Sequence, residues 1–362
     1  MQRLAAALDM DQIDHAVVLD LALQIDEKST YDDEPRYAAA RELLVGLGVD
    51  KVRLKEVRPA AQTVSRSILY LSEHLGINEI IKLINNFPQI AGLSEENLEG
   101  RRKYLELGKK RFIELILKYP QIVSPSEENL EGRRKYLELD KKRFIELILK
   151  YPPIVGLSED NLEGRRKYLE LDKKRFIELV LKYPQIVSYS EENLERRRKY
   201  LELDKKKFIE LILKFPPIVG YSEENLEGKR KYLELDKERF IELILKFPPI
   251  VSLSEENLER KFGYYERHFG ESRMDIINRV INGQVFLLGC SFYTRILLRV
   301  KYASCFMNER VETLDDVIRL ISPKEDKFLK MLRGADLSKY AELRGMSEVL
   351  KNTNGPVKSK QR

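Results

Sequence analysis

Residues 126–156 read SEENLEGRRKYLELDKKRFIELILKYPPIVG, and nearly the same string stands before and after this stretch. Its first serine and the proline after its last aromatic residue both recur at a step of 32 residues. The serines are Ser94, Ser126, Ser158, Ser190, Ser222 and Ser254, and the prolines are Pro88, Pro120, Pro152, Pro184, Pro216 and Pro248. A fixed period of this length indicates repeated supersecondary units that stack on one another.

Each unit has the pattern of two helices. Ser126 is a good N-cap, and Glu127 and Glu128 suit the positive first turn of the helix that follows it. The segment LELDKK interrupts the pattern and turns the chain. A second helix follows, with apolar residues around most of its circumference, so we expect it to be the buried one. Its main stripe repeats at i, i+3, i+4 and i+7, at Phe144, Leu147, Ile148 and Tyr151.

Proline ends the second helix. Pro152 and Pro153 have no N–H with which to continue the helical hydrogen bonds, and a proline restricts the residue before it. The IVG that follows is long enough for one short turn before the next serine. Neither helix can bury its apolar stripe alone, whereas stacked neighbours bury a continuous core.

We therefore expect an all-α fold, a right- or left-handed α-solenoid of tandem 32-residue helical repeats. The glycines within the first helices (Gly100, Gly132, Gly164 and Gly228) indicate close packing against an adjacent helix, although Arg196 and Arg260 take their place in two units. The expected organisation is an N-terminal helical region, acidic at its start (1–57), a degenerate first repeat (58–93), five near-identical repeats (94–253), divergent C-terminal repeats or cap (254–335), and a C-terminal extension with a basic disordered tail (336–362).

Charge is unevenly distributed along the 362 residues. The net charge is +6, but residues 1–36 hold nine acidic and three basic residues and carry −6, so the remainder carries +12. A basic chain that follows an acidic N-terminal segment indicates a polyanionic partner for the basic part. The alternative is that the charge serves solubility alone. The start has no long apolar segment or transit-peptide pattern, and no apolar run is long enough to span a membrane. The chain has only two cysteines, which argues against a disulfide framework and for an intracellular compartment.

No catalytic motif stands out. The acidic residues recur in every unit, as a solvated helix face does, whereas a catalytic carboxylate is normally unique. The sequence has no phosphate-binding glycine loop, and its three histidines are far from one another and from any cysteine. We therefore expect no enzyme, no cofactor and no metal.

The basic residues form two clusters in each unit, one on the first helix and one at the turn before the second helix. In one unit they are Arg133, Arg134 and Lys135, then Lys141, Lys142 and Arg143. Stacking aligns equivalent positions into ladders that can contact successive phosphates. The alternative is pairing with acids of the same unit, such as Glu131 with Lys135. We favour phosphate contact for the turn cluster, and the candidates in the repeats are Arg101, Lys109, Lys110, Arg111, Arg133, Lys141, Lys142, Arg143, Arg165, Lys173, Lys174, Arg175, Arg197, Lys205, Lys206, Lys207, Lys237 and Arg239.

Identical repeats limit how much of a nucleic-acid sequence can be read. Base readout needs different side chains at successive positions, and here the same ones recur. Contacts to the backbone, or recognition of a duplex by its shape, fit this pattern better. The helical spacing of one aromatic row favours packing over base stacking; its members are Tyr104, Tyr136, Tyr168, Tyr200 and Tyr232.

The spacing of proline and leucine resembles the repeat of the mitochondrial transcription termination factor (mTERF) family. The matching cadence is Pro120, Ile122, Leu130 and Leu137, then Phe144, Tyr151 and Pro152. YLSEHLGINEIIKLINNFP (70–88) has the same cadence, and LLGCSFYTRILLRVKY (287–302) and SPKEDKFLKML (322–332) resemble the closing segments of the family. The resemblance covers roughly residues 58–332. Asp140 and its equivalents stand where the family commonly has glycine.

This resemblance implies an mTERF-like superhelix that binds nucleic acid and acts in transcription regulation or termination, or on ribosomal RNA. It adds Arg295, Arg299 and Lys301 as candidate contacts, the two arginines matching an Arg-x-x-x-Arg pattern. We expect the partner to be double-stranded DNA or structured RNA, and we expect a monomer that does not involve a membrane. If the family resemblance holds, we expect a mitochondrial protein. The absence of a transit-peptide pattern instead favours the cytoplasm. The alternative functions are a scaffold whose groove holds a partner's helix or acidic segment, and a spacer between the two ends.

Overall fold

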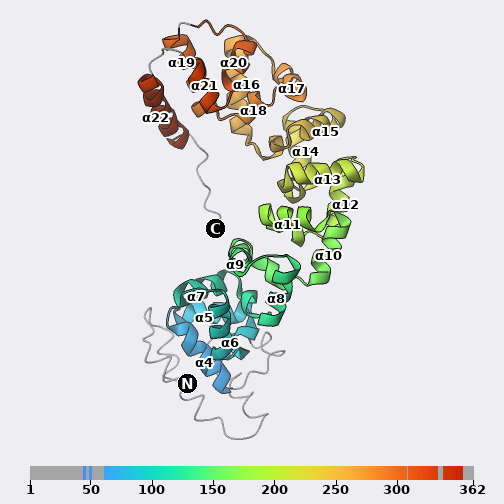
Figure 1. The fold of residues 1–362 in the computed structure, drawn as a ribbon, viewed down its shortest axis with the longest axis vertical. Coiled ribbons are helices and arrows are strands. Elements are labelled where there is room, and N and C mark those ends of the chain that lie inside the picture. The colour runs from blue at the N-terminus through green and yellow to red at the C-terminus, as the bar shows by residue number, and fades with distance from the viewer. Residues whose placement is uncertain (1–43, 46–48, 51–60, 308, 333–336, 354–362) are drawn as a thin grey trace. The chain divides into compact units, whose positions relative to one another are not determined.

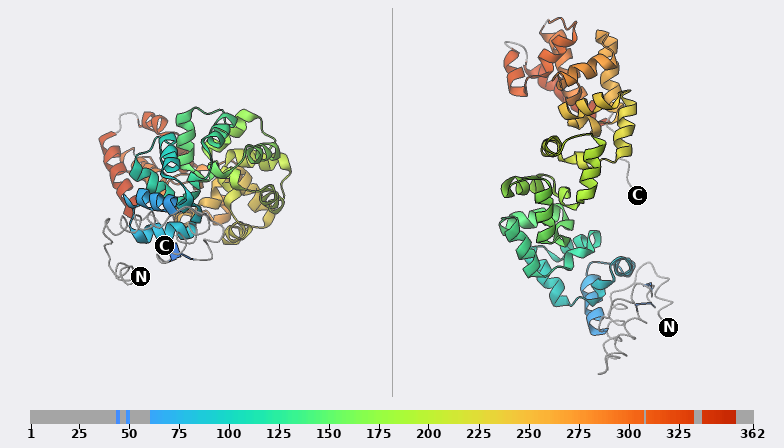
Figure 2. Two further views of the ribbon diagram at one scale, coloured as in Figure 1. Left: turned by 90° about the horizontal axis from the view of Figure 1, so that it is seen from below. Right: turned by 90° about the vertical axis from the view of Figure 1, so that its right-hand side faces the viewer.

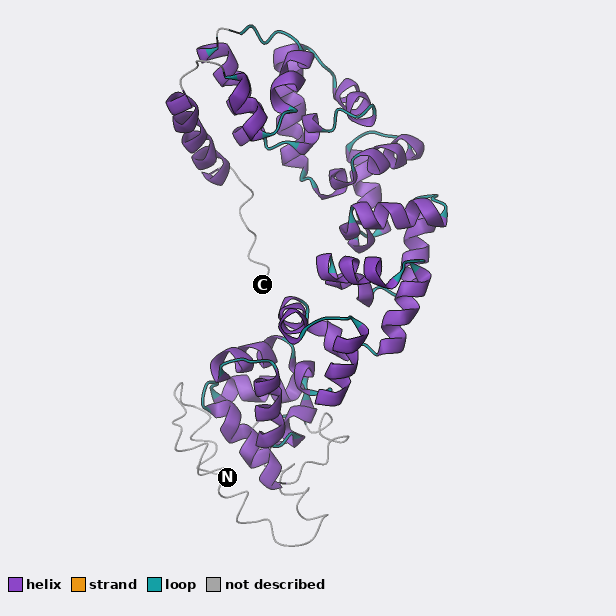
Figure 3. Ribbon diagram, viewed as in Figure 1, coloured by secondary structure: helices purple, strands orange, loops and turns teal. Residues whose placement is uncertain are grey.

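The computed structural model describes residues 44–45, 49–50, 61–307, 309–332 and 337–353. Within these ranges the chain forms helices and contains no strand (Figure 3). The chain divides into two compact units, one ending at Ser190 and the other beginning at Glu191. Most of the region 1–57 lies outside the described residues.

The first unit consists of helix pairs, each closed by a short 3₁₀ turn (Figure 1). The elements are α4 (Ala61–Ser72), α5 (Ile77–Asn86), η1 (Pro88–Gly92), α6 (Glu95–Tyr104), α7 (Lys109–Lys118), η2 (Pro120–Val123), α8 (Glu127–Tyr136), α9 (Lys141–Lys150), η3 (Pro152–Gly156), α10 (Glu159–Tyr168), α11 (Lys173–Lys182) and η4 (Pro184–Ser188).

The second unit continues the same alternation and then changes. Its repeats contain α12 (Glu191–Tyr200), α13 (Lys205–Lys214), η5 (Pro216–Gly220), α14 (Glu223–Tyr232), α15 (Lys237–Lys246) and η6 (Pro248–Ser252). They are followed by α16 (Glu255–Phe269), α17 (Arg273–Ile281), α18 (Phe286–Gly289), a π-helix η7 (Phe292–Leu297), α19 (Leu298–Phe306), α20 (Leu314–Ile321), α21 (Glu325–Met331) and α22 (Leu337–Thr353). Figure 2 shows the helix pairs of each unit from two further directions.

Local chemistry sets the helix boundaries as the sequence predicts. Ser126 Oγ accepts a hydrogen bond from the Asn129 backbone N–H at 3.1 Å, so it caps α8. Asp140 Oδ1 caps α9 in the same way, accepting from the Arg143 N–H at 2.9 Å. Between the two helices, Glu138 adopts a positive φ of 52°, which turns the chain sharply. The tight turn LELDKK is thus built from one left-handed residue and one cap.

The second helix of each repeat supplies most of the core, which confirms the prediction from its apolar pattern. In α9 the side chains of Phe144, Ile145, Leu147 and Ile148 are buried, whereas α8 buries only Leu130. A fully buried phenylalanine contributes about 2 kcal/mol, and the equivalent phenylalanine of each repeat is at most 1% exposed. Within the first unit η2 contacts η3, η3 contacts η4, and α8 contacts α10, so successive repeats stack as an α-solenoid.

The expectation that the helix glycines mark close helix packing is wrong. A Cβ added to Gly132 would meet only the carboxylate of Glu159, at 2.5 Å, and one added to Gly228 would meet nothing within 4 Å. Arg196, which replaces the glycine in one repeat, instead approaches Glu223 of the next repeat at 3.8 Å. The glycine position therefore faces the first-turn acid of the following repeat.

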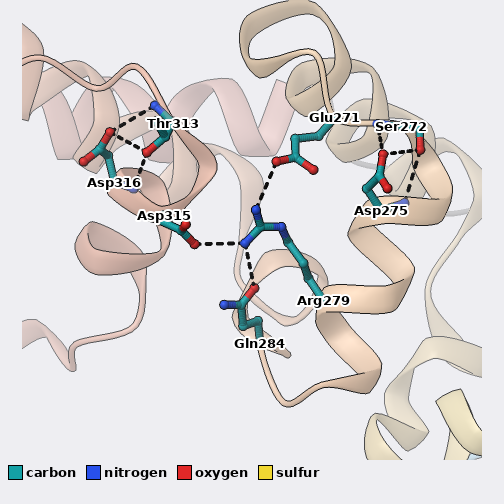
Figure 4. Close-up of polar contacts among 8 residues, drawn as sticks. All are labelled: Glu271, Ser272, Asp275, Arg279, Gln284, Thr313, Asp315 and Asp316. Atoms are coloured by element: carbon teal, nitrogen blue, oxygen red, sulfur yellow. Dashed lines mark hydrogen bonds and ion pairs between the residues drawn. The ribbon is translucent and has the colours of Figure 1, made fainter.

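The end of the second unit is held by polar contacts of a different kind (Figure 4). Capping boxes at Ser272 and Thr313 begin α17 and α20. Between them, Arg279 donates to Asp315 Oδ1 at 2.9 Å and to Glu271 Oε1 at 3.1 Å. This arginine therefore ties α17 to the start of α20. Farther along, α22 extends to Thr353, into the segment expected to be disordered, and residues 354–362 lie outside the described part.

No helix among the described residues is long and apolar enough to cross a membrane.

Candidate nucleic-acid interface

Three rows of basic side chains run along the first helices, and each row has its own environment. We call them the junction row (Arg101, Arg133, Arg165, Arg197 and Lys229), the turn-locking row (Arg102, Arg134, Arg166, Arg198 and Arg230) and the outer lysine row (Lys103, Lys135, Lys167, Lys199 and Lys231). Every member of the first two rows is half-buried, and every member of the third is exposed.

The junction row faces the next repeat. Arg133 donates from Nε to the Leu157 carbonyl and from Nη1 to the Asn129 carbonyl, the latter at 2.9 Å. Lys229 donates in the same way to the Leu253 carbonyl at 2.7 Å. Burial lowers the pKa of Arg133 and of Lys229, partly offset by the nearby Glu159 and Glu255. The candidates Arg101, Arg133, Arg165 and Arg197 therefore lie at repeat junctions rather than on an open face.

The turn-locking row is bound within its own repeat. Arg166 pairs with Glu163 at 2.5 Å and donates from Nη1 to the Leu171 carbonyl at 2.7 Å, across the left-handed turn. The hydrogen bond from Arg166 lowers the pKa of Glu163 to about 2, and that from Arg230 does the same for Glu227. The alternative interpretation, pairing with acids of the same unit, therefore holds for this row, although Glu131 pairs with Arg134 at 2.8 Å rather than with Lys135.

The tyrosine row joins successive repeats, as the packing interpretation predicts. The hydroxyl of Tyr136 donates to Glu163 at 2.8 Å, and that of Tyr232 donates to Glu259 at 2.7 Å. Burial, reinforced by Glu227, raises the pKa of Tyr200 to about 12. These rings are engaged inside the stack and do not form a free stacking platform.

The first base of each turn cluster also faces its neighbour. Lys109, Lys141, Lys173 and Lys237 lie over tyrosine rings of the preceding repeats, at 4.1, 5.2, 2.9 and 5.2 Å from the ring centroids. Lys237 also pairs with Glu202, a left-handed turn residue, at 2.6 Å. The equivalent Lys205 is half-buried. Cation–π contacts of this kind are worth about 1 kcal/mol, so these bases join repeats.

Of the first bases, Lys141 and Lys237 are exposed as well, but both lie over tyrosine rings. The second and third bases of the turn cluster are exposed in the first four repeats. We call them the turn ladder, and its members are Lys110, Arg111, Lys142, Arg143, Lys174, Arg175, Lys206 and Lys207. Within it, Lys207 approaches Asp204 at 3.7 Å, a surface pair of little strength. Arg239 departs from the ladder because it is half-buried and donates to Asn278 Oδ1.

The three candidates of the closing segment have separate environments. Arg299 is 1% exposed, donates to the carbonyls of Leu320 and Pro323, and pairs with Glu325 at 2.7 Å. Arg295 is half-buried and donates to the Pro323 carbonyl at 2.8 Å. Lys301 alone is exposed. As a correction, Arg299 is a buried structural residue here, since its side chain cannot reach an external ligand.

Sequence reasoning missed a further row of cations on the second helices. Lys118 lies seven residues after Arg111, so the two side chains share one face of α7. They line a groove of about 430 Å³ together with Glu114 and Tyr119. The equivalents of Lys118 are Lys150, Lys182, Lys214 and Lys246, all exposed. The i, i+7 spacing of Arg111 and Lys118 is the sequence pattern from which this row could have been predicted.

The described residues contain no group of three or more His, Cys, Asp or Glu side chains placed to hold a metal ion.

Comparison with protein families gives one match. The family model mTERF matches residues 53–202, 134–238 and 167–302, which overlap and together cover residues 53–302. No curated protein matches the chain.

Proposed function

We propose a nucleic-acid-binding function for this chain, which belongs to the mTERF family. The family consists of helical-repeat proteins with nucleic-acid-binding roles in transcription or on ribosomal RNA, and its members are not known as enzymes. We also propose which surface makes the contact: the turn ladder binds successive phosphates of one nucleic-acid strand.

The observation that carries this proposal is the separation of the basic residues by environment. Arg133 and Lys229 of the junction row and all members of the turn-locking row are bound by carbonyls or carboxylates of the protein itself. Four first bases of the turn clusters lie over tyrosine rings, at Lys109, Lys141, Lys173 and Lys237. The turn ladder keeps two exposed cations in each of the three near-identical repeats of the first unit. When exposed cations of the protein bind phosphates, the counterions condensed on the nucleic acid are released. The affinity for nucleic acid therefore depends strongly on the salt concentration.

A scaffold that binds an apolar partner helix has less support. Such a groove would need exposed apolar side chains along the repeats. Among the described residues of the five repeats, Leu117 is the one large apolar side chain that is exposed. An acidic protein segment would compete with nucleic acid for the same ladder.

Members of the family are mostly organellar. We infer a mitochondrial location for this chain as part of the proposal. Imaging of the tagged full-length chain against a mitochondrial marker tests it, and an even cytoplasmic distribution would contradict it.

The test compares two sets of charge reversals in the first unit. Arg111→Glu, Arg143→Glu and Arg175→Glu change the turn ladder, whereas Lys103→Glu, Lys135→Glu and Lys167→Glu change the outer lysine row by the same total charge. Fluorescence anisotropy measures binding of duplex DNA, single-stranded DNA and structured RNA at low and moderate salt.

We expect the turn-ladder variant to lose on the order of 100-fold in affinity and about three units of salt slope. The outer-row variant should lose much less. Equal losses in both variants would refute the turn ladder as the contact surface, and wild-type binding that does not respond to salt would refute phosphate binding itself.

A further inference from the structure

The second helices carry a carboxylate that a pure phosphate-binding surface would not need. Glu114 lies between Arg111 and Lys118 in the groove of about 430 Å³, three residues after the first and four before the second. Its equivalents are Glu146, Glu178, Glu210 and Glu242. All five are exposed, and no ion pair or hydrogen bond ties any of these side chains to another described residue.

The rest of the groove is chemically unlike a simple anion site. Tyr119 and the half-buried Leu115 and Leu149 supply aromatic and apolar walls. An ionised carboxylate is an acceptor only, so it attracts N–H donors and repels phosphate oxygens. One groove thus combines two cations, one acceptor and one aromatic ring.

This combination matches the parts of a nucleotide whose base is unpaired. The cations suit the phosphate, the tyrosine and leucines suit the face of the base, and the carboxylate suits an amino group on its edge. A duplex keeps that edge inside its base pairs, whereas a single strand can turn it toward the groove.

We propose that this groove, together with the equivalent positions of the other repeats, binds single-stranded nucleic acid and favours bases that carry an exocyclic amino group over uracil and thymine, with Glu114 and its equivalents as the discriminating residues. This inference rests on the proposed nucleic-acid binding and deepens it. The same residue types recur at 32-residue steps, so a tract of like bases is favoured over a mixed sequence.

The repeats do not contribute equally. Lys150 donates to the Leu181 carbonyl at 2.9 Å, and Lys214 to the Leu245 carbonyl at 3.0 Å, so both are partly engaged by the protein. Phe247, which takes the place of Tyr119 in the last repeat, is buried. At Arg111, Glu114, Lys118 and Tyr119 both cations are exposed, so this groove should contribute most.

The experiment compares oligodeoxycytidine with oligodeoxyuridine of equal length. Both bases are pyrimidines; cytosine carries an amino group at C4 and an acceptor at N3, whereas uracil carries a carbonyl group at C4 and an N–H at N3. Binding to the full-length chain is measured by anisotropy. The variant is Glu114→Ala, Glu146→Ala and Glu178→Ala combined. The matched control removes the same charge from the first helices, by Glu96→Ala, Glu128→Ala and Asp160→Ala.

The wild type should bind oligodeoxycytidine roughly tenfold more tightly than oligodeoxyuridine. The groove variant should bind oligodeoxycytidine more weakly and oligodeoxyuridine more tightly, because it loses an acceptor and a repulsive charge together. The control should keep the wild-type ratio.

Equal binding of both oligonucleotides by the wild type, with steep salt dependence, would overturn this inference and leave the phosphate ladder intact. A preference that survives in the groove variant would overturn the role of Glu114. Absence of binding to any nucleic acid would overturn the proposed function and this inference together.

Discussion

The repeats (94–253) and the C-terminal segment (254–332) use the same basic residue types in opposite ways. In the repeats, arginines and lysines lie at the surface or half-buried against a neighbour, and each environment recurs at 32-residue steps. In the C-terminal segment, Arg299 and Lys261 are almost fully buried, and each makes contacts found once. Position in the fold, rather than residue type, decides whether a cation can meet a ligand.

Lys261 illustrates the cost of burial. Lys261 is 2% exposed, and its ammonium donates to the Leu288 carbonyl. Burial lowers its pKa to about 8, opposed by the nearby Cys290. No repeat contains a cation in such an environment among its described residues. The segment that follows the repeats thus contains fully buried cations, whereas the cations of the repeats are half-buried or exposed.

Arg299→Met should give the largest effect on stability. It leaves the carbonyls of Leu320 and Pro323 and the carboxylate of Glu325 without their donor, which costs about 3 kcal/mol. Urea unfolding and hydrogen exchange of α19 and α20 measure the loss. Lys301→Ala, at an exposed position of the same helix, is the control and should change little. Unchanged protection of α20 would show that Arg299 does not hold this segment.

Arg166→Ala tests a locked arginine of the repeats and should have a smaller effect. The change removes the bonds to Glu163 and to the Leu171 carbonyl, and the loss of stability is modest because the site is solvated. Lys167→Ala, on the exposed side of the same helix, should stay within about 0.5 kcal/mol of wild type. If the two variants melt alike, the turn-locking row does not stabilise the repeat.

These contrasts show how far the sequence alone reaches. The 32-residue step, Ser126 as a cap and the buried second helix follow from local rules, and the structure confirms them. The cap at Asp140 was not predicted, although aspartate is a favoured N-cap residue. The partners of the cations do not follow, because they come from the next repeat. Lys141 meets the ring of Tyr104, and Arg133 meets the carbonyl of Leu157, only once the units are stacked. The domain boundaries and the contact residues stay predictions.

Acid should weaken the repeats through the turn-locking pairs. Folding lowers the pKa of Glu163 and Glu227 from 4.5 to about 2, through hydrogen bonds from Arg166 and Arg230. The stabilisation is therefore present above about pH 4.5 and is lost as the pH falls toward 2, where the folded state also takes up the proton. Carboxyl NMR titration measures both groups. In Arg166→Ala the pKa of Glu163 should rise toward 4.5 while that of Glu227 stays; a common shift of both would point to a global charge effect.

Alanine at two glycines of the second unit should give the smallest effects, with opposite signs in the two regions. Gly228 lies within α14 of a repeat with open space at its Cβ position, so Gly228→Ala should stabilise by about 1 kcal/mol through helix propensity. Gly270 ends α16 at a φ of 70°, a conformation that a Cβ disfavours, so Gly270→Ala should destabilise by about 1 kcal/mol.

A third glycine, Gly132 of the first unit, provides a comparison within the repeats. Gly132→Ala should stabilise the protein less than Gly228→Ala, since its Cβ would displace the Glu159 carboxylate. Urea midpoints at a constant m-value measure all three. A loss at Gly228 would mean that the repeats are as tightly constrained as the segment that follows them.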